Sequence, residues 1–388
     1  GGYQYQPRKA PKSFVREDDL QGAMDFVGQT DLSYRDAWME ELRKGTLDAY
    51  LAVLLLQLPR LRCLHLERVV FMESHLIGRV GRTVLCRSHS DPRTPAVSTS
   101  LNQLETVHLD RVLGLHSVKT IRNTEDVLPF FYAPSLKEIS VTIDDPLGPV
   151  FPRPTDPPLA HGLASLRLAH IRESHLGPLL SIAPRLRSLH WEWRFDPDAE
   201  DQFNTPVVDL DLLMPALAHL RDTLTELSIT AICSFANEAP MPPPLRVQGS
   251  TKSLAGFNQF KKLFIPLVFL TGFALPVRKK LGSCLPPNPE DLTLTDDLFF
   301  DIDDEWEEAG HTSAMRAWLA DVETSTPRLR KLLLVLQSTE SEIGSEDLDV
   351  RNQIRELTSR GGIELRVEQV HGVYSLRPPP WWGTGSPL

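Results

Sequence analysis

The chain has 388 residues, of which 41% are hydrophobic and 24% are charged, and its formal net charge is −10. This negative charge argues against nucleic acid and anionic membrane surfaces as partners, because both attract basic patches. The longest apolar run, Tyr50 to Leu56, is far shorter than the roughly 20 residues that cross a bilayer.

The cysteines contain no Cys-x-x-Cys pair, and the chain does not open with a signal peptide. Free thiols are typical of a reducing compartment, so we expect a cytoplasmic or nuclear protein. His65, His75 and His89 do not have the spacing of zinc ligands, and no P-loop, Gly-x-Ser-x-Gly or dinucleotide motif occurs. We therefore expect that the protein binds no metal and no cofactor and is not an enzyme. The alternative is an enzyme whose active site is built from residues far apart in the sequence.

The first third of the chain begins with a polar stretch that has no hydrophobic period. We expect residues 1–33 to be poorly ordered. From about Tyr34 to Gln57 the sequence reads as one helix, with Trp38 and Leu42 on its apolar side. This helix would cover the first open strand of the domain that follows, as terminal repeats require.

A recurring phrase then begins: an apolar residue, two variable residues, an apolar residue, one variable residue and an apolar residue. The clearest copies follow a proline, as in Pro59-Arg60-Leu61-Arg62-Cys63-Leu64-His65-Leu66. The leading apolar residues are at 61, 104, 136, 163, 186, 224, 260, 289 and 329, and Ile363/Leu365/Val367 reads as a closing strand. Their steps run from 23 to 43 residues, and most of them exceed the usual repeat of about 20–29, so insertions are expected in most units.

The spacing of this phrase predicts a strand in every unit. Its last two apolar residues are two apart and point to one face, which a single repeat cannot bury alone. Helical periods separate several of the strands and end near Pro134, Pro184 and Pro327. The predicted helices are Thr124–Tyr132, Glu173–Ile182, Asp209–Leu220, Thr312–Val322 and Ser345–Ser359.

Strands that are joined by helical crossovers run parallel. We therefore predict an α/β fold, an irregular and horseshoe-like leucine-rich-repeat solenoid. Its parallel strands would lie on the concave face, with helices and variable loops on the convex side. The repeat domain would span residues 34–370, and a tail would follow at 371–388.

The variable positions between the anchors would form two rows across the concave face. The first row is His65, His108, Ser140, Arg167, His190, Ser228, Phe264, Thr293 and Leu333. The second is Glu67, Asp110, Thr142, Ala169, Glu192, Thr230, Pro266, Thr295 and Val335. The candidate protein-binding residues are His65, Glu67, His108, Asp110, Arg167, His190 and Glu192.

A histidine beside a carboxylate on this face would have its charged form favoured, so binding would depend on pH. The alternative is that the rows are only solvated. Three other segments have similar paired interpretations. Pro240–Pro244 is either a polyproline ligand or an extended loop. Asp296–Glu308 is either an acidic docking segment or a solvated loop. Arg377–Trp382 is either an aromatic anchor for a partner or a cap that folds back on the domain.

The recurring helix followed by Ala-Pro-x-Leu-x-x-Leu-x-Leu, at Ala133–Val141 and Ala183–Trp191, resembles the irregular repeats of fungal F-box-type proteins. In that family an F-box binds the Skp1 adaptor, and the repeats hold a substrate for ubiquitin ligation. The resemblance thus implies a protein-interaction scaffold, the substrate-recognition subunit of an SCF-type ligase. Gly1–Thr30 does not match an F-box, so Skp1 is expected as a partner only if a box lies upstream. The alternative is a regulatory or structural repeat protein without a ubiquitin link.

Overall fold

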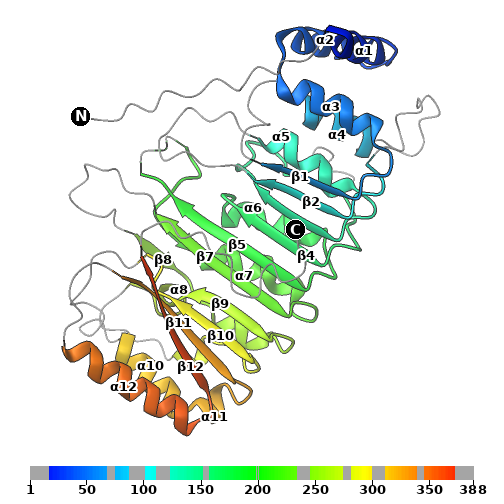
Figure 1. Ribbon diagram of the computed structural model, residues 1–388. Helices are drawn as coiled ribbons and strands as arrows, with labels where there is room; N and C mark the ends of the chain where they lie inside the picture. Colours follow the sequence, from blue (N-terminus) through cyan, green and yellow to red (C-terminus); the bar gives the residue numbers. More distant parts are fainter. Residues whose placement is uncertain are drawn as a thin grey trace, which may run out of the picture. The chain divides into compact units, whose positions relative to one another are not determined.

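The computed structural model describes residues 17–67, 75–86, 101–110, 123–151, 157–197, 199, 201–233, 245–273, 281–298, 311–338 and 345–371 (Figure 1). The chain divides into two compact units, Gly1–Ala164 and Ser165–Leu388. The polyproline segment and the tryptophan-containing tail lie outside the described residues, as do residues 299–308 of the acidic segment.

Unit 1 combines a helical start with a small parallel sheet. Its elements are α1 (Glu17–Gly28), α2 (Arg35–Lys44), α3 (Leu47–Gln57), β1 (Cys63–Glu67), α4 (Leu76–Leu85), β2 (Thr106–Asp110), α5 (Thr124–Val127), the 3₁₀ helix η2 (Leu128–Tyr132) and β3 (Glu138–Thr142). The strand order is β1-β2-β3, and Leu64, Val107 and Ile139 lie in register. The anchors of β2 and β3 are almost fully buried, as the repeat predicts.

The helical start differs from the single helix that the sequence predicts. Gly45 adopts a left-handed φ of 76°, ends α2, and turns the chain into α3. The buried Trp38 joins the two helices, because its Nε1 donates to the Ala49 carbonyl at 2.9 Å. Residues 17–28 form α1, which packs against α2, although low order was expected there. The expected boundaries at 33/34 and 370/371 stay a prediction.

A close approach of helices completes unit 1 on the side away from the strand face. Gly78 of α4 lies against the backbone of Asp126 in α5, where a Cβ atom would collide with the Asp126 Cα. The helix predicted over Thr124–Tyr132 is one α-helical turn followed by η2. Pro129 explains this change, because it lacks the N–H that an α-helix would use at that position.

Unit 2 continues the same pattern over more strands. Its elements are β4 (Ser165–Ala169), α6 (Glu173–Ser181), β5 (Ser188–Phe195), β6 (Val207–Asp209), α7 (Leu210–Leu217), η3 (Ala218–Leu220), β7 (Glu226–Cys233), β8 (Arg246–Gln248), η4 (Lys252–Gly256), β9 (Lys262–Pro266), α8 (Leu267–Thr271), η5 (Leu281–Ser283), β10 (Asp291–Thr295), α10 (His311–Ala320), α11 (Val322–Ser325), β11 (Lys331–Ser338), α12 (Ser345–Arg360) and β12 (Glu364–His371).

The main strands of unit 2 are parallel in the order β4-β5-β7-β9-β10-β11-β12, and β6 pairs with β8 as a separate parallel pair. The ten strands that the repeated phrase predicts are all present across the two units. The main differences from prediction are the added β6–β8 pair and the broken helices of unit 1. In the described part of the chain, no helix is both long and apolar enough to cross a membrane.

The strand entries show why the units repeat. In unit 2 the Lys261 carbonyl accepts from the N–H groups of Glu290 and Asp291, and the Glu290 carbonyl accepts from those of Arg330 and Lys331. Unit 1 has the same arrangement at the Arg62 and Glu105 carbonyls. Each entry loop therefore satisfies the backbone groups of the next loop, in addition to the strand ladder.

Candidate protein-binding surface

The two rows of variable positions are in register within each unit. In unit 1, His65 lies opposite His108, which lies opposite Ser140, and Glu67 lies opposite Asp110. In unit 2, the first row runs through Arg167, His190, Ser228, Phe264, Thr293 and Leu333. Ala169, Glu192 and Thr230 form the matching part of the second row. The solvent exposure of these rows differs strongly between the units.

In unit 1 the strand face is open over β1 and β2. His65 is exposed, and its ring meets the His108 ring edge to face with 5.3 Å between centroids. The His108 side chain is 31% exposed, and its Nε2 lies 3.3 Å from Glu138 Oε1. This hydrogen bond lowers the pKa of Glu138 and outweighs the opposing effect of its partial burial. Ser140 on β3 is already buried.

We define the open face as Cys63, His65, His108 and Glu138. Cys63 belongs to the same side of β1 as His65 and carries an exposed free thiol. Glu67 and Asp110 continue the strands beside the open face, but their side chains are outside the described part of the structure. The strand register therefore places four of the predicted residues together on β1 and β2, two of them with described side chains.

Charged side chains flank the open face where the strands begin. Glu105 binds two cations: Arg62 Nη2 lies 3.3 Å from its Oε1, and Lys137 Nζ lies 2.6 Å from its Oε2. The hydrogen bond from Lys137 is the main cause that lowers the pKa of Glu105. These exposed pairs contribute little to stability, but they give the rim alternating charges that a partner can match.

In unit 2 the expected binding face is covered. His190 is 2% exposed, its Nδ1 lies 2.9 Å from Ser228 Oγ, and its Nε2 lies 3.5 Å from Thr230 Oγ1. Burial lowers the pKa of His190 to about 3, and the nearby Arg167 charge adds to this shift. His190 is therefore neutral near pH 7, which corrects the expectation of a charged, exposed histidine at this position. Arg167 itself is half-buried.

Glu192 is 4% exposed, so it does not present a carboxylate to solvent either. The carboxyl of Asp297, just after β10, lies over this region, because its Oδ2 accepts from the Ala231 N–H at 3.1 Å. Burial raises the pKa of Asp297 to about 6, and the Glu192 charge acts in the same direction. The polar residues Glu192 and Thr295 of the second row are thus buried, and Asp297 joins this region from more than sixty residues further along the chain than Ala231.

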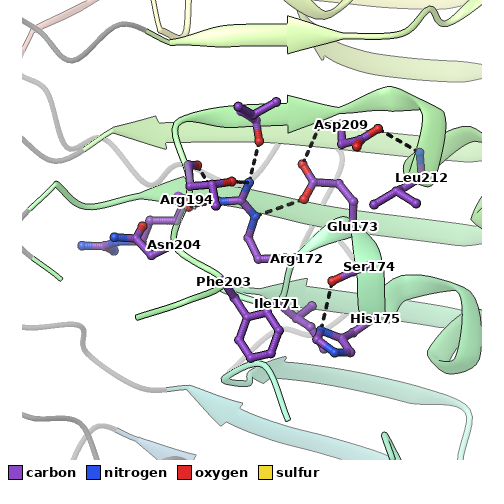
Figure 2. Close-up of polar contacts among 12 residues, drawn as sticks. Ile171, Arg172, Glu173, Ser174, His175, Arg194, Phe203, Asn204, Asp209 and Leu212 are labelled. Atoms are coloured by element: carbon purple, nitrogen blue, oxygen red, sulfur yellow. Dashed lines mark hydrogen bonds and ion pairs between the residues drawn. The ribbon is translucent and has the colours of Figure 1, made fainter. Parts of the chain in front are cut away.

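The most extensive polar network of unit 2 surrounds Arg172 and Glu173 at the start of α6 (Figure 2). Arg172 Nε donates to Glu173 Oε2 at 3.0 Å. The two terminal nitrogens donate to the carbonyls of Arg194, Thr205 and Val207 and to the Thr205 hydroxyl. The guanidinium also lies 4.9 Å from the centroid of the Trp193 ring.

These bonds use all five N–H groups that an arginine has. Glu173 Oε1 in turn accepts from the Asp209 N–H, and the Asp209 carboxylate caps α7 through the N–H groups of Asp211 and Leu212 (Figure 2). Burial raises the pKa of Glu173 against the lowering effect of Arg172. The network holds β5, β6 and two helices together and has no donor left on Arg172 for a ligand.

Another buried carboxylate lies in unit 1, away from the open face. Asp126 is fully buried, and its Oδ2 lies 2.6 Å from His75 Nδ1. This bond is the main cause that raises the pKa of His75, while burial raises that of Asp126. His75 adopts a left-handed φ of 54° just before α4, and Asp48 Oδ2 accepts from the following Leu76 N–H. The pair connects α4 to α5 and so has a structural role.

Glu138, Arg172 and His75 make important contacts that were not predicted from the sequence. Glu138 could have been predicted, because it lies two residues before Ser140 of the first row and therefore on the same side of β3. Arg172 and His75 could not, since the carbonyls that Arg172 binds and the carboxylate that His75 binds come from distant segments. Within the described residues, no group of three or more His, Cys, Asp and Glu side chains is arranged to hold a metal ion.

No curated protein matches this chain. A family model described as a leucine-rich repeat domain matches residues 12–143. The matched segment contains α1 to α3 as well as β1 to β3, so it begins before the repeat domain expected from residue 34. The open face therefore lies on the part of the chain that is similar to a leucine-rich repeat domain.

Proposed function

We propose that this chain is a non-enzymatic protein-interaction scaffold that binds a partner protein through the open face. The observation that carries the proposal is the exposed His65–His108–Glu138 cluster, on a parallel sheet inside the segment that matches the repeat family. Repeat families of this kind typically use the strand side as a binding surface.

The chemistry of the open face favours a polar segment of the partner. Its imidazoles can donate or accept hydrogen bonds, its carboxylate can accept them, and the Arg62–Glu105–Lys137 rim offers both signs of charge. Such a surface gives specificity and orientation rather than a large apolar contact. The covered rows of unit 2, including His190 and Glu192, are assigned to stability in this proposal.

We further propose a specific architecture for the repeats and a role for the chain in ubiquitin ligation. In this finer version of the proposal, the repeats form an irregular solenoid, and the chain is the substrate-recognition part of an SCF-type ubiquitin ligase in the cytoplasm or nucleus. Its support is the resemblance of the two Ala-Pro-x-Leu-x-x-Leu-x-Leu segments to fungal F-box-type repeats. A regulatory repeat protein without a ubiquitin link is the alternative.

Cys63 allows the binding surface to be tested directly. Its thiol is exposed, whereas Cys86, Cys233 and Cys284 are buried. A photo-crosslinker attached to Cys63 in the full chain should capture a specific protein from extract of the source cells, and the crosslink should be lost in His65→Ala/His108→Ala. The matched control is Cys63→Ser/Ser359→Cys, which moves the label to an exposed position on α12.

Equal capture from both label positions would contradict the open face as the binding surface. Affinity purification of the full-length protein then tests the ligase version. Recovery of Skp1 and a cullin would support that version. Their absence, together with a specific Cys63 crosslink, would exclude the ligase role and leave the scaffold proposal in place.

A further inference from the structure

The strand β12 ends the sheet of unit 2, beside β11 (Figure 1). Among the described residues, no strand pairs with its outer edge. It has eight residues, longer than the average strand of about five or six. Proteins usually shorten, bulge or cover such edges, because an unpaired row of N–H and C=O groups recruits other strands.

The hydrogen-bond pattern shows which groups face outward. Glu364 donates its N–H to the Arg330 carbonyl, and it lies in register with Lys331. In a parallel ladder, alternate residues bond to the same neighbour, so Arg366 and Glu368 also bond to β11. The backbone groups of Leu365, Val367 and Gln369 therefore point to the open edge.

The side chains along this edge carry alternating charges. Glu364, Arg366 and Glu368 lie on one side of the sheet, and Leu365 and Val367 lie on the other. Val367 is 36% exposed and Leu365 is half-buried, so the apolar side is incompletely covered. Arg366 contacts Glu364 of its own strand at 2.7 Å, but both side chains are largely in solvent, and such pairs exchange partners at little cost.

We propose that β12 is a dimerisation surface that pairs antiparallel with β12 of a second copy, with the two-fold axis at Val367. This register puts each Arg366 opposite Glu368 of the other copy, and it covers Val367 with its own symmetry mate. The outward N–H and C=O groups of Val367 then form a mutual hydrogen-bonded pair. Arg366 and Glu368 fall at the non-hydrogen-bonded positions, where opposite side chains are closest.

Two neighbouring symmetric registers are disfavoured by charge. Opposite residues of an antiparallel pair point to the same side of the sheet. A two-fold axis perpendicular to the sheet must therefore lie between one residue and the same residue of the second copy. An axis at Arg366 would oppose two arginines and put Glu364 against Glu368, and an axis at Glu368 would oppose two glutamates. Like charges directly opposite each other destabilise a strand pair, so both of these registers are disfavoured for a second copy of this chain. An axis at Leu365 would put Glu364 opposite Arg366 but leave Glu368 without a charged partner, so the Glu368 variant distinguishes it from the axis at Val367.

Charge reversal in the full chain tests the register. Sedimentation velocity of the wild type should show a monomer–dimer equilibrium at micromolar concentrations. Arg366→Glu and Glu368→Arg should each weaken the dimer at least about tenfold, because each creates two like-charged pairs. The double variant Arg366→Glu/Glu368→Arg should dimerise again, since it restores opposite charges. A mixture of the two single variants should form a heterodimer for the same reason.

Glu323→Arg is the matched control, because Glu323 is exposed on α11 and the change in charge is the same. It should leave the dimer unaffected. Val367→Pro removes an outward N–H without removing a bond to β11, so it should abolish the dimer while the circular dichroism stays unchanged. A wild type that stays monomeric would overturn the proposal, and so would a dimer that survives either charge reversal. A wild type that stays monomeric and instead pairs with a strand of another protein would also overturn the proposal.

Discussion

The strand faces of the two units are built from the same repeated phrase but have opposite surroundings. In unit 1, His65 and His108 lie in solvent or at its margin, and Glu138 is within hydrogen-bonding distance of His108. In unit 2, the equivalent His190 is buried beside Ser228. One repeat position is therefore open to solvent in one unit and packed in the other, depending on what covers it.

The buried ion pair of unit 2 provides the largest expected contrast. Arg172→Met should lower the free energy of unfolding by about 3–5 kcal/mol, because it leaves Glu173 buried without its cation and several carbonyls without a donor. Arg62→Met, at the exposed rim of unit 1, should cost less than about 1 kcal/mol. Urea unfolding of both variants measures the difference, and equal losses would contradict the assignment of Arg172 to the core.

The histidines of the two faces give the next contrast. His190→Ala should destabilise the protein by about 2–3 kcal/mol, since it removes a buried hydrogen-bond partner of Ser228 and leaves a cavity. His65→Ala should change stability by no more than about 0.5 kcal/mol. Thermal and urea unfolding compare the two. If His65→Ala were as costly as His190→Ala, the distinction between an open and a covered face would fail.

A third prediction concerns where unit 1 is tightly packed. Gly78→Ala should cost about 1–3 kcal/mol, because its Cβ would push against the Asp126 backbone and separate α4 from α5. Gly22→Ala on α1 is the control: its Cβ meets open space, and alanine in a helix should stabilise by roughly 0.5–1 kcal/mol. Hydrogen exchange of α4 and α5 would locate the loss. A neutral Gly78→Ala would show that the helical side of unit 1 is loose.

The smallest expected effect is a pair of opposite pH dependences. His190 has a folded pKa of about 3 against an ordinary 6.5, so the unfolded chain binds the extra proton between these values. Its contribution to stability is present above about pH 6.5 and is lost as the pH falls. The pKa of His75 is raised by Asp126, so its contribution is present below about 6.5 and is lost as the pH rises through the folded pKa.

Each histidine can change the unfolding free energy by at most about 1.4 kcal/mol per pH unit. Urea unfolding at several values between about pH 5 and pH 8 should show that His190→Gln removes a rise of stability with pH, whereas His75→Gln removes a fall. Slopes of the same sign for both variants would contradict the different surroundings of the two side chains.

Most of the strand layout was predictable, because it depends on local alternation. Leu64, Val107 and Ile139 are anchors of the phrase, and their register follows from it. The helices were less predictable where single residues interrupt a period. Gly45 breaks the expected Tyr34–Gln57 helix through its left-handed φ, and Pro129 turns part of Thr124–Tyr132 into a 3₁₀ helix.

The candidate site was predictable in its alignment but not in its exposure. The neighbours His65 and His108 follow from the strand spacing, and the structure places their rings 5.3 Å apart. The burial of His190 and Glu192 did not follow, because the side chains that surround them come from other segments. Asp297 illustrates this, since it bonds to Ala231 across a long separation in sequence.

By itself, the sequence determined the strands, their parallel order and the rows that the variable residues form, because a period of two and a phrase at the strand entry are local properties. The tertiary structure alone decided which parts of those rows meet solvent, which carbonyls Arg172 binds, and which strand ends the sheet of unit 2. These features arise from contacts between residues far apart in the chain, and burial depends on every segment that packs above a side chain.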